Sequence, residues 1–129
     1  MATALKKNCS SIQSTTKHLV SLEQQLIAIL GPHGVEFLRN DGQTRIPGNI
    51  SLSFPGQDGE AMLHRLDLMG ICVSTSSACD STNTQISHVL RAIGLDVRFA
   101  KGTIRISLGK HSTSGDVDSI ASALIKILK

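Results

Sequence analysis

The stretch "GTIRISLG", at residues 102–109, alternates apolar and polar side chains, and it decides the fold that this chain is expected to adopt. Successive side chains of a β-strand point to opposite faces of its sheet, so the alternation predicts a strand with its aliphatic side chains in a core. Arg105, which lies between Ile104 and Ile106, is then predicted to point to the other face. The stretch "NISLSF", at residues 49–54, shows the same alternation and predicts a second half-buried strand.

Apolar residues recur at helical spacing in three further stretches. The helices predicted from them span residues 15–30, 59–68 and 113–128. The pair Gly31-Pro32 ends the first helix, and Asp58 caps the N-terminus of the second. Residues 1–15 carry a few apolar side chains among serines and threonines, and they either extend the first helix or fray.

Two short strands and one short helix complete the expected elements. The strands are read at residues 35–38, "VEFL", and at residues 71–74, "ICVS", and the helix follows a serine cap at residues 88–94. Cys72, on the second of these strands, is expected in the core. Strands and helices alternate without a regular βαβ repeat. The sequence therefore predicts one α+β domain over residues 1–129, with a small, mainly antiparallel sheet flanked by helices.

The composition restricts the classes of protein to which the chain can belong. Hydrophobic residues make up 40% of it and the aromatic residues are three phenylalanines, so the core is expected to be aliphatic. The formal charge of +3 comes from scattered lysines and arginines, and no basic run exceeds Lys6 and Lys7, so nucleic acid is not an expected partner. No stretch approaches the roughly 18 apolar residues of a membrane span. No membrane association is therefore expected.

The cysteines and histidines indicate neither a disulfide framework nor a metal site. Cys9, Cys72 and Cys79 form no CxxC pair and no even set, which suits a reducing compartment and predicts a cytoplasmic location. The five histidines share no metal-ligand spacing, so no metal is expected.

Two residues stand out as candidates for chemistry. Cys79 lies in the long connection at residues 74–87, among serines and threonines, where a cysteine that only packs as a small hydrophobe is out of place. It is read either as a reactive thiol or as an incidental loop cysteine, and a catalytic pair with His88 is disfavoured by their separation. Arg105 is read either as part of a solvated sheet face or as a fixed guanidinium that captures a carboxylate.

Three blocks of the sequence together resemble one family. They are "RIPGNISLSFPGQDGEAMLHRLDLMGICVSTSSAC" (45–79), "SHVLRAIG" (87–94) and "GTIRISLGKHST" (102–113). The chain is similar, from about residue 16 to its end, to the C-terminal small domain of the NifS/IscS-type cysteine desulfurases, class V relatives of the fold-type I aminotransferases. The resemblance implies the α+β fold of that domain.

The resemblance also implies roles for three residues. Cys79, in the "SSAC" context, would be the mobile-loop nucleophile that takes sulfur from L-cysteine as a persulfide and leaves alanine. Arg105, in "RISLG", would bind the carboxylate of the substrate, and Asn49, in "PGN", would lie near the active-site cleft. The persulfide would then pass to a scaffold or sulfur-acceptor protein, for iron–sulfur clusters or thiolated tRNA.

The sequence departs from the family pattern in the loop and in the cofactor site. Asp80 stands where a small residue is usual, and "NTQIS" at residues 83–87 replaces a stretch that normally contains proline. No lysine has the "S-x-H-K" setting that holds pyridoxal phosphate in the family. The chain alone is therefore expected to bind no cofactor and to be inactive.

The resemblance, together with the missing cofactor lysine, predicts the identity of the chain and its partners. It is expected to be the C-terminal part of a pyridoxal-phosphate-dependent enzyme, either excised or one half of a split protein. Its partners would be a large cofactor-binding domain on the same or another chain and a sulfur acceptor. The apolar face left by an absent domain also predicts self-association as a homodimer. The alternatives are a non-enzymatic persulfide carrier or interaction module, and a remnant without sulfur chemistry.

Overall fold

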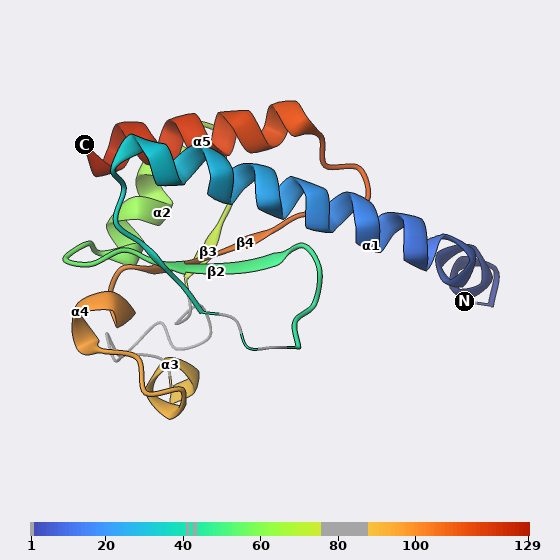
Figure 1. The fold of residues 1–129 in the computed structure, drawn as a ribbon, viewed down its shortest axis with the longest axis horizontal. Helices are drawn as coiled ribbons and strands as arrows, with labels where there is room; N and C mark the ends of the chain where they lie inside the picture. Colours follow the sequence, from blue (N-terminus) through green and yellow to red (C-terminus); the bar gives the residue numbers. More distant parts are fainter. Residues whose placement is uncertain (1, 41, 43, 76–87) are drawn as a thin grey trace.

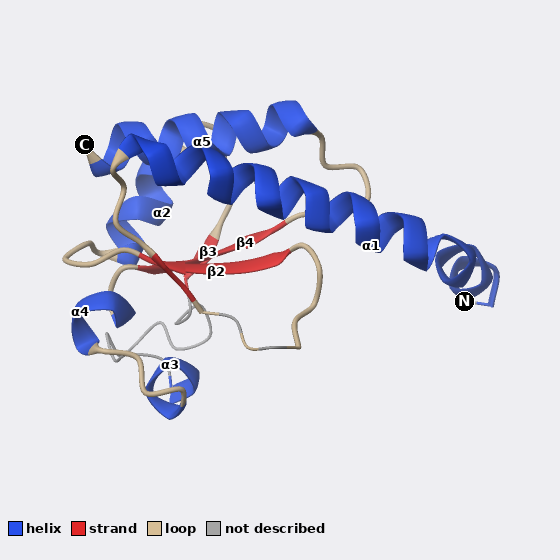
Figure 2. Ribbon diagram, viewed as in Figure 1, coloured by secondary structure: helices blue, strands red, loops and turns tan. Residues whose placement is uncertain are grey.

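In the computed structural model, which describes residues 2–40, 42, 44–75 and 88–129, four strands form one antiparallel sheet (Figures 1 and 2). The strands are β1 (Leu38–Arg39), β2 (Asn49–Ser53), β3 (Ser74–Thr75) and β4 (Thr103–Ser107). Their order across the sheet is β1-β2-β4-β3, so the two long strands lie in its centre. The predicted small antiparallel sheet is confirmed.

Helices cover both sides of this sheet. They are α1 (Ala2–Leu30), the 3₁₀-helix η1 (Gly31–His33), α2 (Gly59–Asp67), α3 (His88–Ala92), α4 (Val97–Ala100) and α5 (Ser114–Leu128). In Figure 1, α1 and α5 lie side by side above the strands, and α3 and α4 lie below them. No helix in the described part of the chain is both long enough and apolar enough to cross a membrane.

The core lies between the sheet and the layer of α1, α2 and α5. Every second side chain of β2 and β4 points into the core, and the apolar faces of the three helices pack against these side chains. Its most deeply buried members are Leu26, Leu30, Ile50, Leu52, Phe54, Leu66, Ile104, Val117, Ala121 and Leu124. The aliphatic core expected from the composition is confirmed.

The ends of the three long helices follow from local sequence. The sequence left open whether residues 1–15 extend the first helix or fray, and in the structure α1 begins at Ala2. The Asp58 side chain accepts a hydrogen bond from the Ala61 N–H and caps α2. Thr113 and Asp116 form a capping box at the start of α5, in which each side chain accepts the other residue's backbone N–H.

Both of the short predicted strands lie a few residues from where the structure has them. Val35 and Phe37 pack against the core, with the Phe37 ring 6.3 Å from that of Phe54, and the ladder with β2 begins only at Leu38. The Ile71 N–H is bound to the carbonyl of Leu66, so this segment completes the end of α2, and β3 begins at Ser74.

The placement of Cys72 in the core was wrong. Cys72 is exposed, because the segment between α2 and β3 is not a strand and turns Ile71 and Val73 inward instead. Its sulfur lies 3.9 Å from an oxygen of Asp67. The helix α4, which Asp96 caps, was not predicted because four residues are too few to show a helical period. Residue 87, the expected cap of α3, lies outside the described residues.

Candidate functional site

The face of the sheet opposite the core is polar, and we call it the polar face. It carries side chains of β2, β4 and β3: Asn49, Ser51, Ser53, Thr103, Arg105, Ser107 and Ser74. Residues directly opposite each other in an antiparallel ladder project to the same side. The register therefore sets these side chains in adjacent pairs.

Arg105 stands at the centre of the polar face. Its strand pairs on both sides, with Ser51 opposite it on β2 and Ser74 opposite it on β3. Its side chain is exposed, and one terminal nitrogen donates to the Ser74 hydroxyl at 3.4 Å. A guanidinium mounted in this way has donors left to bind a carboxylate through two parallel hydrogen bonds.

Asn49 lies near Arg105 on the same face. It is exposed and pairs with Ser107, two residues along β4 from the arginine. Diagonal neighbours of this kind lie about 7–8 Å apart. Its backbone N–H closes a turn by donating to the carbonyl of Ile46 at 3.2 Å. The structure therefore brings two of the three predicted site residues together.

The other end of the polar face is covered and internally bonded. The Asn40 amide donates to the hydroxyls of Ser53, at 2.6 Å, and Ser51, at 3.2 Å. The Ser53 and Thr103 hydroxyls are 2.6 Å apart, and Thr103 also donates to the carbonyl of Phe99 before β4. Ser53 and Thr103 are buried although their positions in the alternation predict exposure. This network leaves the Asn49–Arg105 end as the open part of the face.

The third predicted site residue, Cys79, lies outside the described residues, as do Asp80 and the departures at residues 83–87. The described chain leads towards it from β3. Thr75 is buried, and its hydroxyl donates to a carboxylate oxygen of Glu60 on α2 at 2.7 Å. The point from which the Cys79 segment starts is therefore held firmly, next to Arg105.

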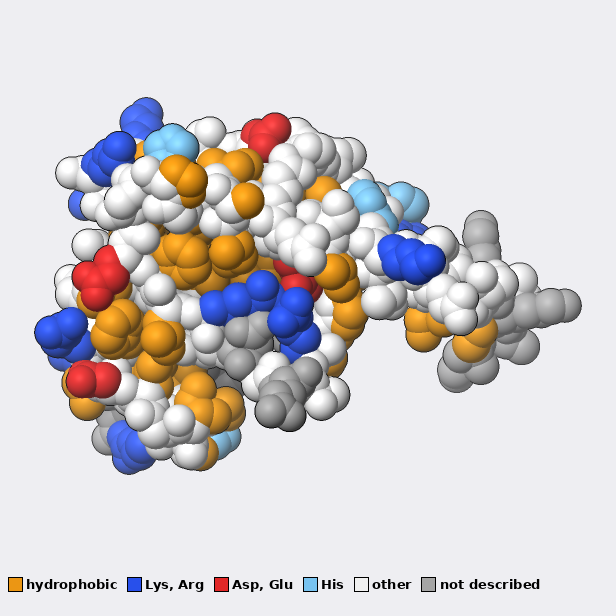
Figure 3. Space-filling model, in the orientation of Figure 1, with side chains coloured by type: hydrophobic (Ala, Val, Ile, Leu, Met, Phe, Trp, Pro, Cys, Tyr) orange, Lys and Arg blue, Asp and Glu red, His pale blue; other side chains and the backbone are white. Residues whose placement is uncertain are grey.

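A buried carboxylate that was not predicted lies close to this site. Glu23 on α1 is fully buried, and it binds Arg39 at 2.7 Å, Arg45 at 3.4 Å and the N–H of Gly48. Figure 3 shows basic side chains gathered near the middle of the face drawn. The signal in the sequence is an acidic residue directly beside Leu22, on the stripe of α1 that faces the core.

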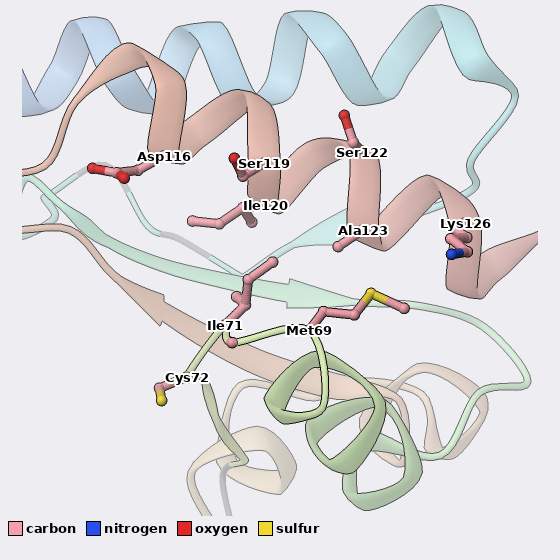
Figure 4. A pocket seen from close by; sticks show the side chains of 10 residues that line it. Met69, Ile71, Cys72, Asp116, Ser119, Ile120, Ser122, Ala123 and Lys126 are labelled. Atoms are coloured by element: carbon pink, nitrogen blue, oxygen red, sulfur yellow. The ribbon is translucent and has the colours of Figure 1, made fainter.

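A pocket lies elsewhere in the described part of the molecule. A pocket of about 630 Å³ opens between α5 and the segment from Met69 to Cys72, on the helical side of the sheet. Ile71 and Ile120 extend into it and charged side chains stand at its two ends (Figure 4). Neither Arg105 nor Asn49 lines it, so the two described residues of the predicted site lie apart from this pocket, on the polar face. Within the described ranges, no cluster of histidine, cysteine and acidic side chains is arranged to hold a metal ion.

Comparisons with known proteins agree with the resemblance seen in the motifs. A model of the aminotransferase class-V family matches residues 3–120. The cysteine desulfurase IscS of Clostridium botulinum is 45% identical over 89 residues, which are 69% of this chain and 22% of that protein. The IscS-like cysteine desulfurase of Mycobacterium tuberculosis is 36% identical over 126 residues, which are 96% of this chain and 32% of that protein.

The fold has a counterpart among solved structures. A structure described as a NifS-like protein superposes with a TM-score of 0.82 at 31% identity, and the match covers 98% of this chain and 32% of that one. A NifS-like protein from Rickettsia africae gives a TM-score of 0.75 at 28% identity, over 92% of this chain and 30% of that one. The predicted α+β fold is confirmed. The chain spans between about a fifth and a third of the length of the two curated relatives described.

Proposed function

The chain belongs to the aminotransferase class-V family, and from this premise we propose that residues 1–129 form the C-terminal small domain of a cysteine desulfurase. The observation that carries the proposal is the position of Arg105. Its exposed guanidinium stands on a doubly paired strand and donates to Ser74, which precedes Cys79 by five residues in the sequence. A reaction on an amino-acid thiol needs a group that binds the carboxylate and a thiol that can reach the same substrate.

In this proposal Arg105 binds the carboxylate of L-cysteine. Its backbone is fixed by two ladders, so the guanidinium holds the substrate at a constant place while sulfur is removed. Asn49 occupies the diagonal position on the same face, a spacing of about 7–8 Å between residues, so its amide would be within reach of a substrate that Arg105 holds. The two residues would together orient the substrate.

Cys79 is the proposed sulfur acceptor. It follows Thr75 by four residues, so its Cα lies within about 14 Å of the Thr75 Cα in any extended or folded path. Its thiolate would bond to the sulfur of L-cysteine as the carbon–sulfur bond of the substrate breaks. The products are a persulfide on Cys79 and L-alanine, which together contain all atoms of the reactants. The persulfide sulfur would then pass to an acceptor protein.

The described residues do not fit a covalent site for pyridoxal phosphate, the cofactor that the family resemblance implies. Lysines lie on α1 and α5, in the turns on either side of β4 and at residue 129, and no lysine lies on the four strands of the described sheet. We propose that a large domain, on the same or another polypeptide, holds the cofactor. The cofactor would supply the electron sink that weakens the carbon–sulfur bond. A cytoplasmic location suits a thiol that must stay reduced.

The test joins these residues to a cofactor-binding partner. The part of the Mycobacterium tuberculosis relative that lies outside the match is fused to residues 1–129, and sulfide and alanine are assayed with L-cysteine and pyridoxal phosphate. We expect turnover by this chimera and none by the isolated chain. Cys79→Ser should abolish turnover, and Arg105→Gln should raise the KM for L-cysteine.

Two results would contradict the proposal. Turnover by the isolated chain would show that the chain needs no second domain. An inactive chimera that folds and binds the cofactor would argue against a small-domain role. If the isolated chain instead takes sulfur onto Cys79 from a separate desulfurase, the chain is a persulfide carrier.

A further inference from the structure

Glu23 is a buried charged group that the proposed function does not use. It lies on α1, on the core side of the sheet, and its side chain has no exposed surface. Its carboxylate accepts hydrogen bonds from Arg39 on β1 and from the N–H of Gly48, and it forms an ion pair with Arg45. One partner on β1 and two in the connection between β1 and β2 therefore meet at one carboxylate.

The Gly48 contact links this carboxylate to the open end of the polar face. Gly48 immediately precedes Asn49, and its own carbonyl accepts from the N–H of Leu108 at 2.7 Å, just after β4. Its N–H is thus bound to α1, and its C=O is bound to the residue that directly follows the strand carrying Arg105. The peptide before Asn49 has its position fixed from both directions.

The backbone of Gly48 has little freedom to move. Its φ of +84° lies in the left-handed region, which favours glycine. A Cβ built there would stand 2.6 Å from the carbonyl oxygen of Leu108 and 3.2 Å from two methyl carbons of Leu19. Gly48 is therefore closely packed on the side of Leu108 and Leu19, and its N–H is held by Glu23.

We propose that Glu23 is a positioning residue for the substrate: through Gly48 it sets where Asn49 stands relative to Arg105. This inference rests on the proposed function. A buried ion pair adds little net stability compared with apolar residues of the same size, whereas its geometry requirement is strict. The carboxylate of Glu23 therefore helps to align the start of β2 with the end of β4 on the polar face.

The test compares two variants that both break the Glu23–Arg39 ion pair. Glu23→Leu also removes the acceptor of the Gly48 N–H, whereas Arg39→Met leaves that acceptor and Arg45 in place. In the 129-residue chain, we expect at least about tenfold faster hydrogen exchange of the Gly48 amide in Glu23→Leu, together with shifted NMR signals of Asn49 and Arg105. Arg39→Met should leave the amide and both signals close to those of the parent chain.

The same variants in the chimera separate positioning from stability. Glu23→Leu is expected to raise the KM for L-cysteine about tenfold with kcat changed less than about threefold, and Arg39→Met to change both less than about twofold. An equal rise in KM in both variants, at equal loss of stability, would overturn the inference. If Glu23→Leu does not fold, Glu23→Gln takes its place, with changes in the same direction and smaller.

Failure of the proposed function is distinguishable from failure of this inference. A chimera that is inactive with its parent residues contradicts the proposed function, and the NMR comparison still decides whether Glu23 positions Asn49. Unchanged Gly48 exchange and unchanged Asn49 and Arg105 signals in a folded Glu23→Leu chain would overturn the inference whatever the chimera does.

Discussion

The two faces of the β2–β4 strand pair differ in burial and in composition. On the core face, Ile104 and its neighbours on β2 and β4 are buried under α1 and α5. On the polar face, one residue along, Arg105 is exposed and Asn49 stands near it. The same ladder fixes both sets, so the stability of the buried face determines the geometry of the exposed one.

The difference teaches which changes the fold tolerates. A side chain on the core face is shielded from water, and its truncation leaves a cavity. A side chain at the open end of the polar face has few contacts to lose, so its identity is free to follow chemistry. Substitutions on the two faces should therefore differ in their effect on stability.

The largest effect is expected on the core face. Ile104 is fully buried, so Ile104→Ala should lower the free energy of unfolding by about 2–5 kcal/mol. Arg105→Ala, one residue along the same strand, should change it by less than about 0.5 kcal/mol. Urea denaturation followed by circular dichroism measures both. Equal losses in the two variants would break the comparison.

A smaller loss of stability is expected from a substitution at Gly48, which directly precedes β2. Gly48→Ala should cost about 1–3 kcal/mol beyond the control, because its Cβ meets the Leu108 carbonyl oxygen at 2.6 Å. Gly34→Ala is the matched control, since Gly34 also has a positive φ, of +70°, but nothing within 4 Å of a built Cβ. Thermal unfolding of both variants gives the difference, and its absence would show that the packing around Gly48 yields.

The covered end of the polar face should couple two hydroxyls. Ser53 and Thr103 are buried with their oxygens 2.6 Å apart, so the pair is expected to contribute about 0.5–1.5 kcal/mol. A double-mutant cycle with Ser53→Ala and Thr103→Val isolates this coupling. A coupling of zero would mean that this part of the polar face is as tolerant as Arg105.

The smallest effect concerns the helical layer and pH. The Thr113 backbone N–H, and then its hydroxyl, hold the pKa of Asp116 below its usual value of 3.8. The ionised carboxylate therefore stabilises the fold at pH values above 3.8, and this contribution is lost as the pH falls through the lowered pKa. The gap in Tm between the parent chain and Asp116→Asn should narrow on acidification. A gap that stays constant would contradict the assignment.

The alternation of residues 102–109 was enough to predict β4, its buried face and the exposed Arg105. Longer periodic elements were also predicted, because many positions repeat the same signal. The two-residue strands β1 and β3 were misplaced because their ladders begin where β2 and β4 offer partners, which local sequence does not encode. Cys72 was assigned to the core on the same misreading of residues 71–74.

The candidate site divides in the same way. The strand period puts Arg105 on the polar face, but its nearness to Asn49 depends on the register between β2 and β4. Glu23 was missed because its partners, among them Gly48, lie far along the chain and meet only in the fold. A motif identifies single residues, whereas contacts between residues far apart in the sequence determine which of them lie together in the fold.

The most direct test of the central claim is the mass of the chimera after incubation with L-cysteine. We expect the addition of one sulfur atom, on the peptide that contains Cys79, together with release of alanine. Cys79→Ser should remove the added sulfur, and Arg105→Gln should shift its formation to higher L-cysteine concentrations. Sulfur that appears on another cysteine such as Cys72, or whose formation is unaffected by Arg105→Gln, would contradict the account.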